Sequence, residues 1–450
     1  MVLVFVGMTL AAGTNRLMAA SDSLSWDVKQ GRVDADIESW DLRQVLEQVA
    51  AATGWKVYLD PKAVHNVSVR FKHLSTGEAL HSLLGNVNFV VVPQTNAPSR
   101  LYVFRTTQAQ ATRLISPAVS KPAKPIPNQL IVTMKPGSKT KIEDLAKSLN
   151  AKIIGRMDGQ NAYLLQFQDE AATQAAKEQL LSNPDVASVD VNYPVDRPPS
   201  LDISGGSVPD LQLTPKTNDG PCQLVVGLID TPVQSLSTNL NPFLRPAIHV
   251  AGDSQVDPSQ ITHGTAMIET IIDALAKTGG KSSVQILPVD VYGTSESTTT
   301  FDVANGIVQA VNNGANIINL SLGSTGDSQL LHDTITKVSQ QGIPIYAAAG
   351  NQPVTTPTYP AAYPEVVAVT ASDSSGNIAS YANRGSFIDM IAPGDNVVPY
   401  NGQSYFVEGT STSTAFASGM AAGLADSAHV CADQAQGLLQ KSLKTTSWPK

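Results

Sequence analysis

The sequence predicts an α/β protein in which two small α+β domains precede a larger domain built on a parallel sheet. The chain has 450 residues, 42% hydrophobic and 15% charged, which is enough apolar material for several cores. Two proline-rich linkers, 108–127 and 197–221, separate three blocks of periodic sequence. In the last block, apolar runs alternate with helical stretches, which is typical of a parallel sheet covered on both faces.

The first 22 residues contain an apolar run from Val2 to Ala12, followed by small residues. This pattern predicts a signal segment and a secreted or periplasmic protein; a misassigned start codon or a truncated signal is the alternative, since no basic residue precedes the run. The net charge of −8 argues against nucleic acid as a partner. Cys222 and Cys431 are too few for a disulfide-built scaffold or a cysteine-ligated zinc module, and form either one disulfide or two buried thiols.

The hydrophobic pattern of block 24–107 predicts a small α/β unit. Asp41 is placed to cap a first helix with an apolar face at Leu42, Val45 and Leu46, and Ser75 starts a second helix. Strands are expected at 32–37, 56–59, 67–71, 89–92 and 101–104.

The stretches D-L-R-Q-V-L-E-Q-V-A and S-T-G-E-A-L-H-S-L-L in this block resemble the short domain at the N-termini of secretins and TonB-dependent receptors. The resemblance implies docking to another envelope protein; a generic βαβ module without a retained partner is the alternative. His65, His73 and His81 lie eight residues apart, which suits neither one helix face nor a usual metal motif. We interpret them as surface or packing residues.

Block 128–196 shows a β-α-β-β-α-β pattern typical of a ferredoxin-like domain. Its stretches Q-L-I-V-T-M-K-P-G and N-P-D-V-A-S-V-D-V-N-Y resemble the inhibitory prodomain of subtilisin-like peptidases; an unrelated ferredoxin-like domain is the alternative. The proline-rich stretch from Pro194 to Pro221, which contains linker 197–221, is expected to be exposed, and the linker is expected to contain the processing site. Strands are expected at 130–134, 152–157, 162–167 and 187–191, and helices at 141–149 and 170–181.

Block 222–450 carries four polar residues at strand ends or helix starts. Taken singly, Asp230 is a loop cap, His263 a structural histidine, Asn351 a turn residue and Ser411 a helix cap. Jointly they supply an acid, a base, an oxyanion donor and a nucleophile, which hydrolysis of an amide bond requires. Strands are expected at 224–229, 285–291, 317–322, 343–348 and 366–370, and helices near 264–277, 301–313, 328–341 and 412–427.

The segments around these residues resemble the subtilisin-like serine peptidases, or subtilases. They are Asp-Thr at 230–231, H-G-T at 263–265, N-L-S-L-G at 319–323, A-A-G-N at 348–351 and G-T-S at 409–411. The resemblance implies a triad of Asp230, His263 and Ser411, with the Asn351 amide and the Ser411 N–H receiving the oxyanion. It also implies a substrate strand at Ser321, Leu322 and Gly323, and a specificity pocket walled by Ala348, Ala349 and Gly350, with apolar or broad preference.

Three positions depart from the family pattern: Pro232 replaces a glycine, Ala415 a proline and Phe416 a histidine. None of these changes removes a reacting group. No dense Asp/Asn loop predicts a calcium site, and no cofactor is expected. The leading hypothesis is a secreted endopeptidase that acts on peptides or proteins and is made as a self-inhibited zymogen. The alternative is an envelope binding or scaffold protein whose subtilase domain recognises peptides without cleaving them.

Overall fold

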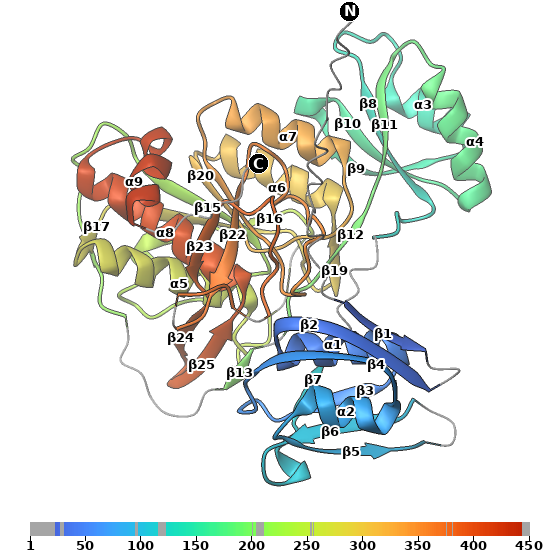
Figure 1. Cartoon of the computed structure of the whole chain (residues 1–450). Helices are drawn as coiled ribbons and strands as arrows, with labels where there is room; N and C mark the ends of the chain where they lie inside the picture. The colour runs from blue at the N-terminus through green and yellow to red at the C-terminus, as the bar shows by residue number, and fades with distance from the viewer. Residues whose placement is uncertain are drawn as a thin grey trace, which may run out of the picture. The chain divides into compact units, whose positions relative to one another are not determined.

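The computed structural model describes residues 23–27, 31–94, 98–115, 123–199, 201–203, 211–252, 254, 256–374, 376–379 and 381–442. Figure 1 shows their helices and strands. The chain divides into two compact units, Met1–Ala118 and Val119–Lys450. The expected signal segment, 1–22, lies outside the described residues.

The first unit packs two helices with two sheets around one core. Asp41 caps the first helix by accepting a hydrogen bond from Gln44 N, and Ser75 caps the second in a capping box with Glu78, as the sequence predicts. The helices are α1 (Leu42–Thr53) and α2 (Thr76–Leu84). One sheet has the order β1 (Ser23–Asp27), β2 (Arg32–Asp41), β4 (Asn66–Ser75), and the other β5 (Asn88–Val92), β6 (Arg100–Phe104), β3 (Lys56–Leu59), β7 (Arg113–Ile115).

Two of the three histidines in this unit make local contacts. His81 packs edge-on against Phe89, and His73 pairs with Asp34 at the surface. The strands β1 and β7 are additions to the predicted order.

The second unit begins with a four-stranded antiparallel sheet covered by two helices, and the predicted β-α-β-β-α-β order is confirmed. A 3₁₀ turn, Asp158–Gln160, joins the two middle strands where the sequence has Asp158-Gly159. The sheet order is β11 (Val186–Val191), β8 (Gln129–Met134), β10 (Ala162–Gln166), β9 (Lys152–Met157), and the helices are α3 (Ile142–Ser148) and α4 (Glu170–Leu181).

The rest of the second unit is built on a seven-stranded parallel sheet (Figure 1). Its strands run in the order β16 (Ile248–His249), β18 (Gln285–Asp290), β15 (Val225–Asp230), β20 (Ile317–Leu320), β21 (Ile345–Ala348), β22 (Val367–Ser372), β23 (Met390–Pro393). All neighbours pair in parallel. The parallel-sheet fold predicted from the alternating apolar runs is therefore confirmed.

Helices cover both faces of this sheet and form two separate cores. One core includes α5 (His263–Thr278), α8 (Thr410–Ala428) and α9 (Ala435–Ser442), and the other α6 (Thr300–Asn312) and α7 (Gln329–Ser339). Small residues on α8 let it pack closely on α5. A Cβ at Gly419 would lie 2.7 Å from the carbonyl oxygen of Ile271, so the contact is one that glycine permits.

Parts of the proline-rich stretch after residue 193 differ from the prediction of exposed chain. β12 (Pro194–Asp196) pairs antiparallel with β19 (Ser297–Thr299), and Val195 is only 2% exposed. Further along, β14 (Thr214–Pro215) pairs with β17 (Lys281–Ser282) and Leu213 is buried. Proline is compatible with these short edge pairings because it sits where no ladder N–H is required. The proline content of the stretch therefore does not reveal which residues pair.

Between these anchors, β13 (Asp202–Ile203) pairs with β25 (Gln403–Glu408), which forms a hairpin with β24 (Asp395–Tyr400). A disulfide joins Cys222, just before β15, to Cys431, just before α9, and decides between the two alternatives that the sequence left open. None of the helices in the described ranges is long and apolar enough to span a membrane.

Candidate active site

Asp230 and His263 are held together at the carboxyl end of the parallel sheet. Asp230 ends β15 and is 1% exposed; His263 is the first residue of α5. The imidazole Nδ1 lies 2.8 and 3.0 Å from the two carboxylate oxygens. A carboxylate can only accept, so Nδ1 carries the proton in this contact and Nε2 is left as the basic nitrogen.

The residue after Asp230 fixes the approach of α5. Thr231 donates its N–H to the Asp230 carboxylate at 2.7 Å, and its hydroxyl accepts from Gly264 N at 2.8 Å. A Cβ at Gly264 would collide with the carbonyl oxygen of Thr231, so glycine is required next to His263. The side chain and backbone of Thr231 therefore determine where His263 stands relative to Asp230.

Ser411 is the second residue of α8 and is partly buried. Its hydroxyl donates to the carbonyl oxygen of Ser321 at 3.1 Å, while the Ser321 hydroxyl donates back to the carbonyl of Ser411 at 3.0 Å. Within the described ranges the Ser411 hydroxyl makes no hydrogen bond to His263. In this state the hydroxyl therefore points toward the end of β20 and would have to rotate about χ1 to meet the imidazole.

Asn351 follows β21 and is exposed, with its side-chain amide held in a defined orientation. Its Oδ1 accepts from the N–H of Thr410 at 2.8 Å and from the Thr410 hydroxyl at 3.0 Å. Because Oδ1 is engaged twice, Nδ2 faces the other way and can donate to a ligand beside Ser411. Gly350 has φ of +103°, and a Cβ there would lie 2.6 Å from Asn383 Nδ2, so this turn also needs glycine.

The residues predicted as substrate strand and pocket wall occupy neighbouring strand ends. Ser321, Leu322 and Gly323 extend β20, and Ala348 and Ala349 end β21 or follow it. Leu322, Ala348 and Ala349 are all buried. The loop carrying Tyr359 lies against this strand, because Ser324 and Tyr359 exchange two backbone hydrogen bonds of 2.9 and 2.7 Å. No charged side chain belongs to this set.

The small domain preceding the parallel sheet caps two of its helices. Asn192 Oδ1 accepts from the Thr300 hydroxyl at 3.0 Å and from Phe301 N at 3.1 Å, at the start of α6. Asp190 Oδ2 accepts from the Ser328 hydroxyl at 2.8 Å and from Leu330 N at 3.1 Å, at the start of α7. Both oxygens satisfy N–H groups that a helix leaves unpaired at its N-terminus.

The chain continues from these caps along β19. Arg197 donates to the carbonyl oxygens of Ser295 at 2.7 Å and Gly293 at 2.6 Å, and its guanidinium lies 5.4 Å from the ring centre of Tyr292. Burial raises the pKa of Tyr292, with the nearby charge of Asp230 adding to the effect, so the phenol stays neutral and donates to the Asp196 carbonyl. The segment 190–197 is therefore bound to the parallel-sheet domain on both sides of Val195.

The sequence motifs predict Asp230, His263, Asn351 and Ser411 but not the residues that orient them. Thr231 and Thr410 each fix a neighbouring polar group, and Asn383 supports the Gly350 turn through hydrogen bonds to Ala349 and Gln352. Thr410 lies within the motif G-T-S, so the sequence indicates that it is near Ser411. The sequence does not indicate its contact with Asn351. Among the described residues, no group of three His, Cys, Asp or Glu side chains is arranged to hold a metal ion.

Two family models match this chain. The model of the Subtilase family matches residues 223–447, and the model of the fervidolysin N-terminal prodomain matches residues 115–192. The chain is 27% identical to M-protease of Shouchella clausii over 308 residues, covering 59% of this chain and 81% of that protein. It is 33% identical to Subtilisin Savinase of Lederbergia lenta over 188 residues, covering 39% of this chain and 70% of that protein.

Two solved structures share the fold. Fervidolysin of Fervidobacterium pennivorans, a keratinolytic enzyme related to subtilisin, matches with a TM-score of 0.54 and 18% identity, covering 69% of this chain and 56% of that one. The epidermin leader peptide processing serine protease of Staphylococcus aureus matches with a TM-score of 0.52 and 17% identity, covering 70% of this chain and 91% of that one. At these identities the likeness concerns the fold alone.

Proposed function

The chain belongs to the subtilase family, and from this premise we propose that Asp230, His263 and Ser411 act as its catalytic triad. The chain is a subtilisin-like serine protease with a prodomain similar to that of fervidolysin. The observation that carries the assignment of residues is the double contact of His263 Nδ1 with Asp230, made by two segments 33 residues apart at the carboxyl end of the sheet.

The proposed reaction begins when the Ser411 hydroxyl turns from Ser321 to His263. His263 Nε2 takes the hydroxyl proton as Oγ attacks the carbonyl carbon of the substrate, and the Asp230 carboxylate stabilises the resulting imidazolium. The C–N bond then breaks, His263 returns the proton to the leaving amine, and an acyl-enzyme on Ser411 is left. Water hydrolyses this ester with His263 again as the base.

The negative charge on the attacked oxygen requires donors that are already in place. We assign them as Asn351 Nδ2, oriented through Thr410, and the N–H of Ser411 at the N-terminus of α8. Ser321, Leu322 and Gly323 are proposed to hold the substrate backbone. Ala348, Ala349 and Gly350 are proposed to wall the specificity pocket, and their small uncharged side chains support an apolar or broad preference.

The protein is proposed to be made as a self-inhibited zymogen. The support is the set of contacts from Asp190 to Arg197, which attach the prodomain to α6, α7 and β19. The mature enzyme would form by cleavage between about 197 and 221, as expected from the sequence. After that cut the prodomain would be held by non-covalent contacts only.

Export and docking are proposed for the N-terminal part of the chain. A disulfide between Cys222 and Cys431 supports an oxidising compartment outside the cytoplasm. The order of helices and strands in block 24–107 supports the short-domain resemblance and a docking role toward an envelope protein. N-terminal sequencing after expression tests removal of residues 1–22, and deletion of block 24–107 should abolish co-sedimentation with the cell envelope.

The alternative, a peptide-binding scaffold that does not cleave, is favoured by one observation: the Ser411 hydroxyl is bonded to Ser321 and not to His263. A fluorophosphonate probe separates the two functions, because only an activated serine displaces fluoride from phosphorus. We expect wild type to be processed and then labelled, and Ser411→Ala to stay full length and unlabelled. Ser413→Ala, two residues along α8, is the matched control and should behave as wild type. A folded wild type that is neither processed nor labelled would refute the peptidase assignment.

A further inference from the structure

A polar side chain lies in the apolar core between β20 and α8. Asn319 stands in β20 between Ile318 and Leu320 and is fully buried. Its amide faces α8, because its Oδ1 accepts a hydrogen bond of 3.0 Å from the hydroxyl of Ser418 on that helix. A buried amide costs free energy unless its donor and its acceptor are both bonded, so the partners of Asn319 indicate which groups it orients.

Three consecutive hydrogen bonds lead from α8 through this amide to the proposed nucleophile. The Ser418 hydroxyl donates to Asn319 Oδ1, and Asn319 Nδ2 donates to Ser321 Oγ at 3.0 Å. The Ser321 hydroxyl in turn donates to the carbonyl oxygen of Ser411 at 3.0 Å. A hydroxyl has a single hydrogen, and because Asn319 donates to the Ser321 oxygen, that hydrogen is directed at Ser411. Hydrogen bonds that run in one direction polarise one another, so the three bonds act as a unit.

The bond to the Ser411 carbonyl does not depend on where the Ser411 hydroxyl points. In the structure two bonds join Ser411 to Ser321, one from each hydroxyl to the carbonyl of the other residue. Rotation of the Ser411 hydroxyl toward His263 breaks the bond that this hydroxyl donates, whereas the bond to the Ser411 carbonyl is unaffected by χ1. The preceding residue is fixed as well, since Thr410 N donates to Asn351 Oδ1 at 2.8 Å. The Ser411 backbone is therefore held from both sides.

We propose that Asn319 is a positioning residue for the nucleophile and that Ser418 anchors it on α8. Asn319 directs the Ser321 hydroxyl at the Ser411 carbonyl. The Ser411 backbone thereby stays in place while its own hydroxyl turns to His263. The Oγ and the N–H of Ser411, which are the proposed attacking atom and oxyanion donor, both depend on that backbone position. The proposal rests on the proposed role of Ser411 and adds a residue that acts on it through Ser321.

Asn319→Leu keeps the branched shape of the side chain and removes both of its hydrogen bonds. In processed enzyme we expect kcat for a small peptide substrate to fall about tenfold with KM within about twofold, because displaced reacting atoms weaken binding of the transition state more than of the substrate. The kcat is expressed per serine labelled by a fluorophosphonate probe, so unfolded protein is not counted. Thr334→Val on α7 is the matched control: it removes a buried hydroxyl that donates to the Leu330 carbonyl at 2.8 Å, and should lower the urea midpoint without changing kcat.

Combined substitutions test whether Asn319 acts through Ser321. Ser321→Ala removes the hydroxyl that contacts Ser411 and should also lower kcat about tenfold. Because Asn319 acts through that hydroxyl, Asn319→Leu should have no further effect once Ser321 is alanine, and the double variant should also lose about tenfold. A role of Asn319 in core packing alone would instead make the two losses multiply to about a hundredfold.

Should Asn319→Leu fail to fold, Ser418→Ala takes its place, because alanine favours a helix and the Ser418 hydroxyl otherwise lies 3.1 Å from the Ala415 carbonyl of its own helix. Ser418→Ala should lower kcat about threefold, and not at all once Ser321 is alanine. An unchanged kcat in folded Asn319→Leu or folded Ser418→Ala, or losses that multiply, would overturn the proposal and leave the assignment of Ser411 standing. A folded wild type whose turnover is absent or survives Ser411→Ala would overturn that assignment and the proposal with it.

Discussion

Replacing Asn192 by alanine should weaken inhibition by the prodomain more than replacing an exposed residue of the prodomain. Asn192 is fully buried, and its Oδ1 accepts hydrogen bonds from Thr300 Oγ1 and Phe301 N, at 3.0 and 3.1 Å. Each such bond contributes about 1 kcal/mol net, so loss of both should cost about 2 kcal/mol. That corresponds to roughly 30-fold weaker inhibition.

The assay adds purified prodomain, residues 123–199, to processed enzyme and measures its inhibition constant with a small peptide substrate. Asn192→Asp is the informative companion, because a carboxylate still accepts both bonds and is favoured at a helix N-terminus. We expect the inhibition constant of the Asn192→Asp prodomain to lie within about threefold of that of the native prodomain. Asp144→Ala, exposed on α3, should have no effect. Circular dichroism of each free prodomain checks folding. Native-like inhibition by Asn192→Ala, or equal losses with Asp and Ala, would refute the capping argument.

Two further predictions concern Thr410 and Asp426. Thr410→Val removes a hydroxyl that donates to Asn351 Oδ1, so kcat for a peptide substrate should fall about tenfold with little change in KM; a raised KM at unchanged kcat would contradict this. Burial opposes ionisation of Asp426, but hydrogen bonds from Ser283 and Ser282 and the charge of Lys216 outweigh it and lower its pKa. Its ionised form therefore stabilises the fold above pH ~4 and loses this contribution as the pH falls through the lowered pKa. Urea midpoints at pH 7 and pH 3 should differ less in Asp426→Asn than in wild type, and equal differences would argue against the effect.

Local signals in this sequence predicted most regular elements because short-range physics determines them. Asp41 and Ser75 cap the helices that their positions indicate, and the β-α-β-β-α-β order of the prodomain follows from hydrophobic periodicity. Five strands of the parallel sheet followed from their apolar runs. β16, β23 and the β24–β25 hairpin did not, since two residues, a four-residue run that ends in proline and a half-exposed hairpin give no distinctive pattern.

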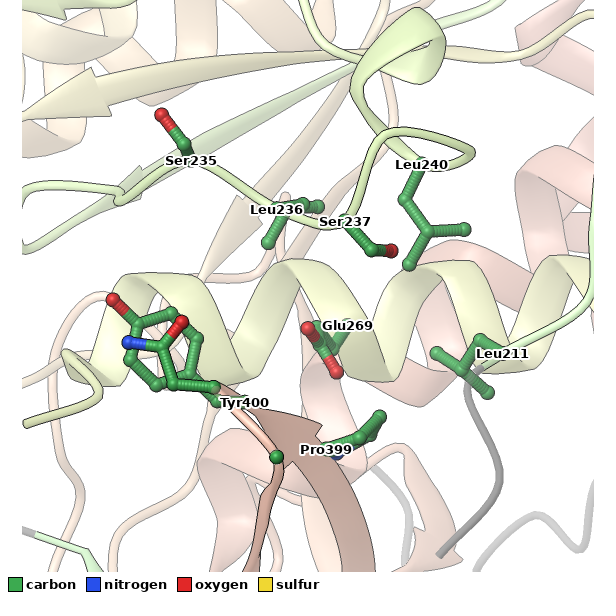
Figure 2. Close-up of a pocket in the computed structure, with 10 residues that line it drawn as sticks. Leu211, Ser235, Leu236, Ser237, Leu240, Glu269, Pro399 and Tyr400 are labelled. Carbon is green, nitrogen blue, oxygen red and sulfur yellow. The ribbon is translucent and has the colours of Figure 1, made fainter.

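Long-range contacts account for what the sequence did not predict. Val195 lies in a stretch whose prolines predict exposed chain, yet pairing with β19 buries it. The order of Asp230, His263, Asn351 and Ser411 predicted a site, whereas the orienting contact from Thr410 to Asn351 joins residues 59 positions apart in a way that no local pattern encodes. A cavity lined by Leu211, Leu236, Glu269 and Tyr400 (Figure 2) is likewise assembled from four segments and has no sequence signature.

The disulfide between Cys222 and Cys431 closes nearly the whole parallel-sheet domain into one covalent ring, because the two cysteines lie 209 positions apart in the sequence. A cut in any surface loop inside that ring opens the circle without releasing a fragment, since both pieces stay covalently joined through sulfur. A protease that shares its surroundings with other copies of itself would in this way survive single nicks. The same closure places the two ends of the domain side by side, so relocating them to a surface loop should preserve the fold.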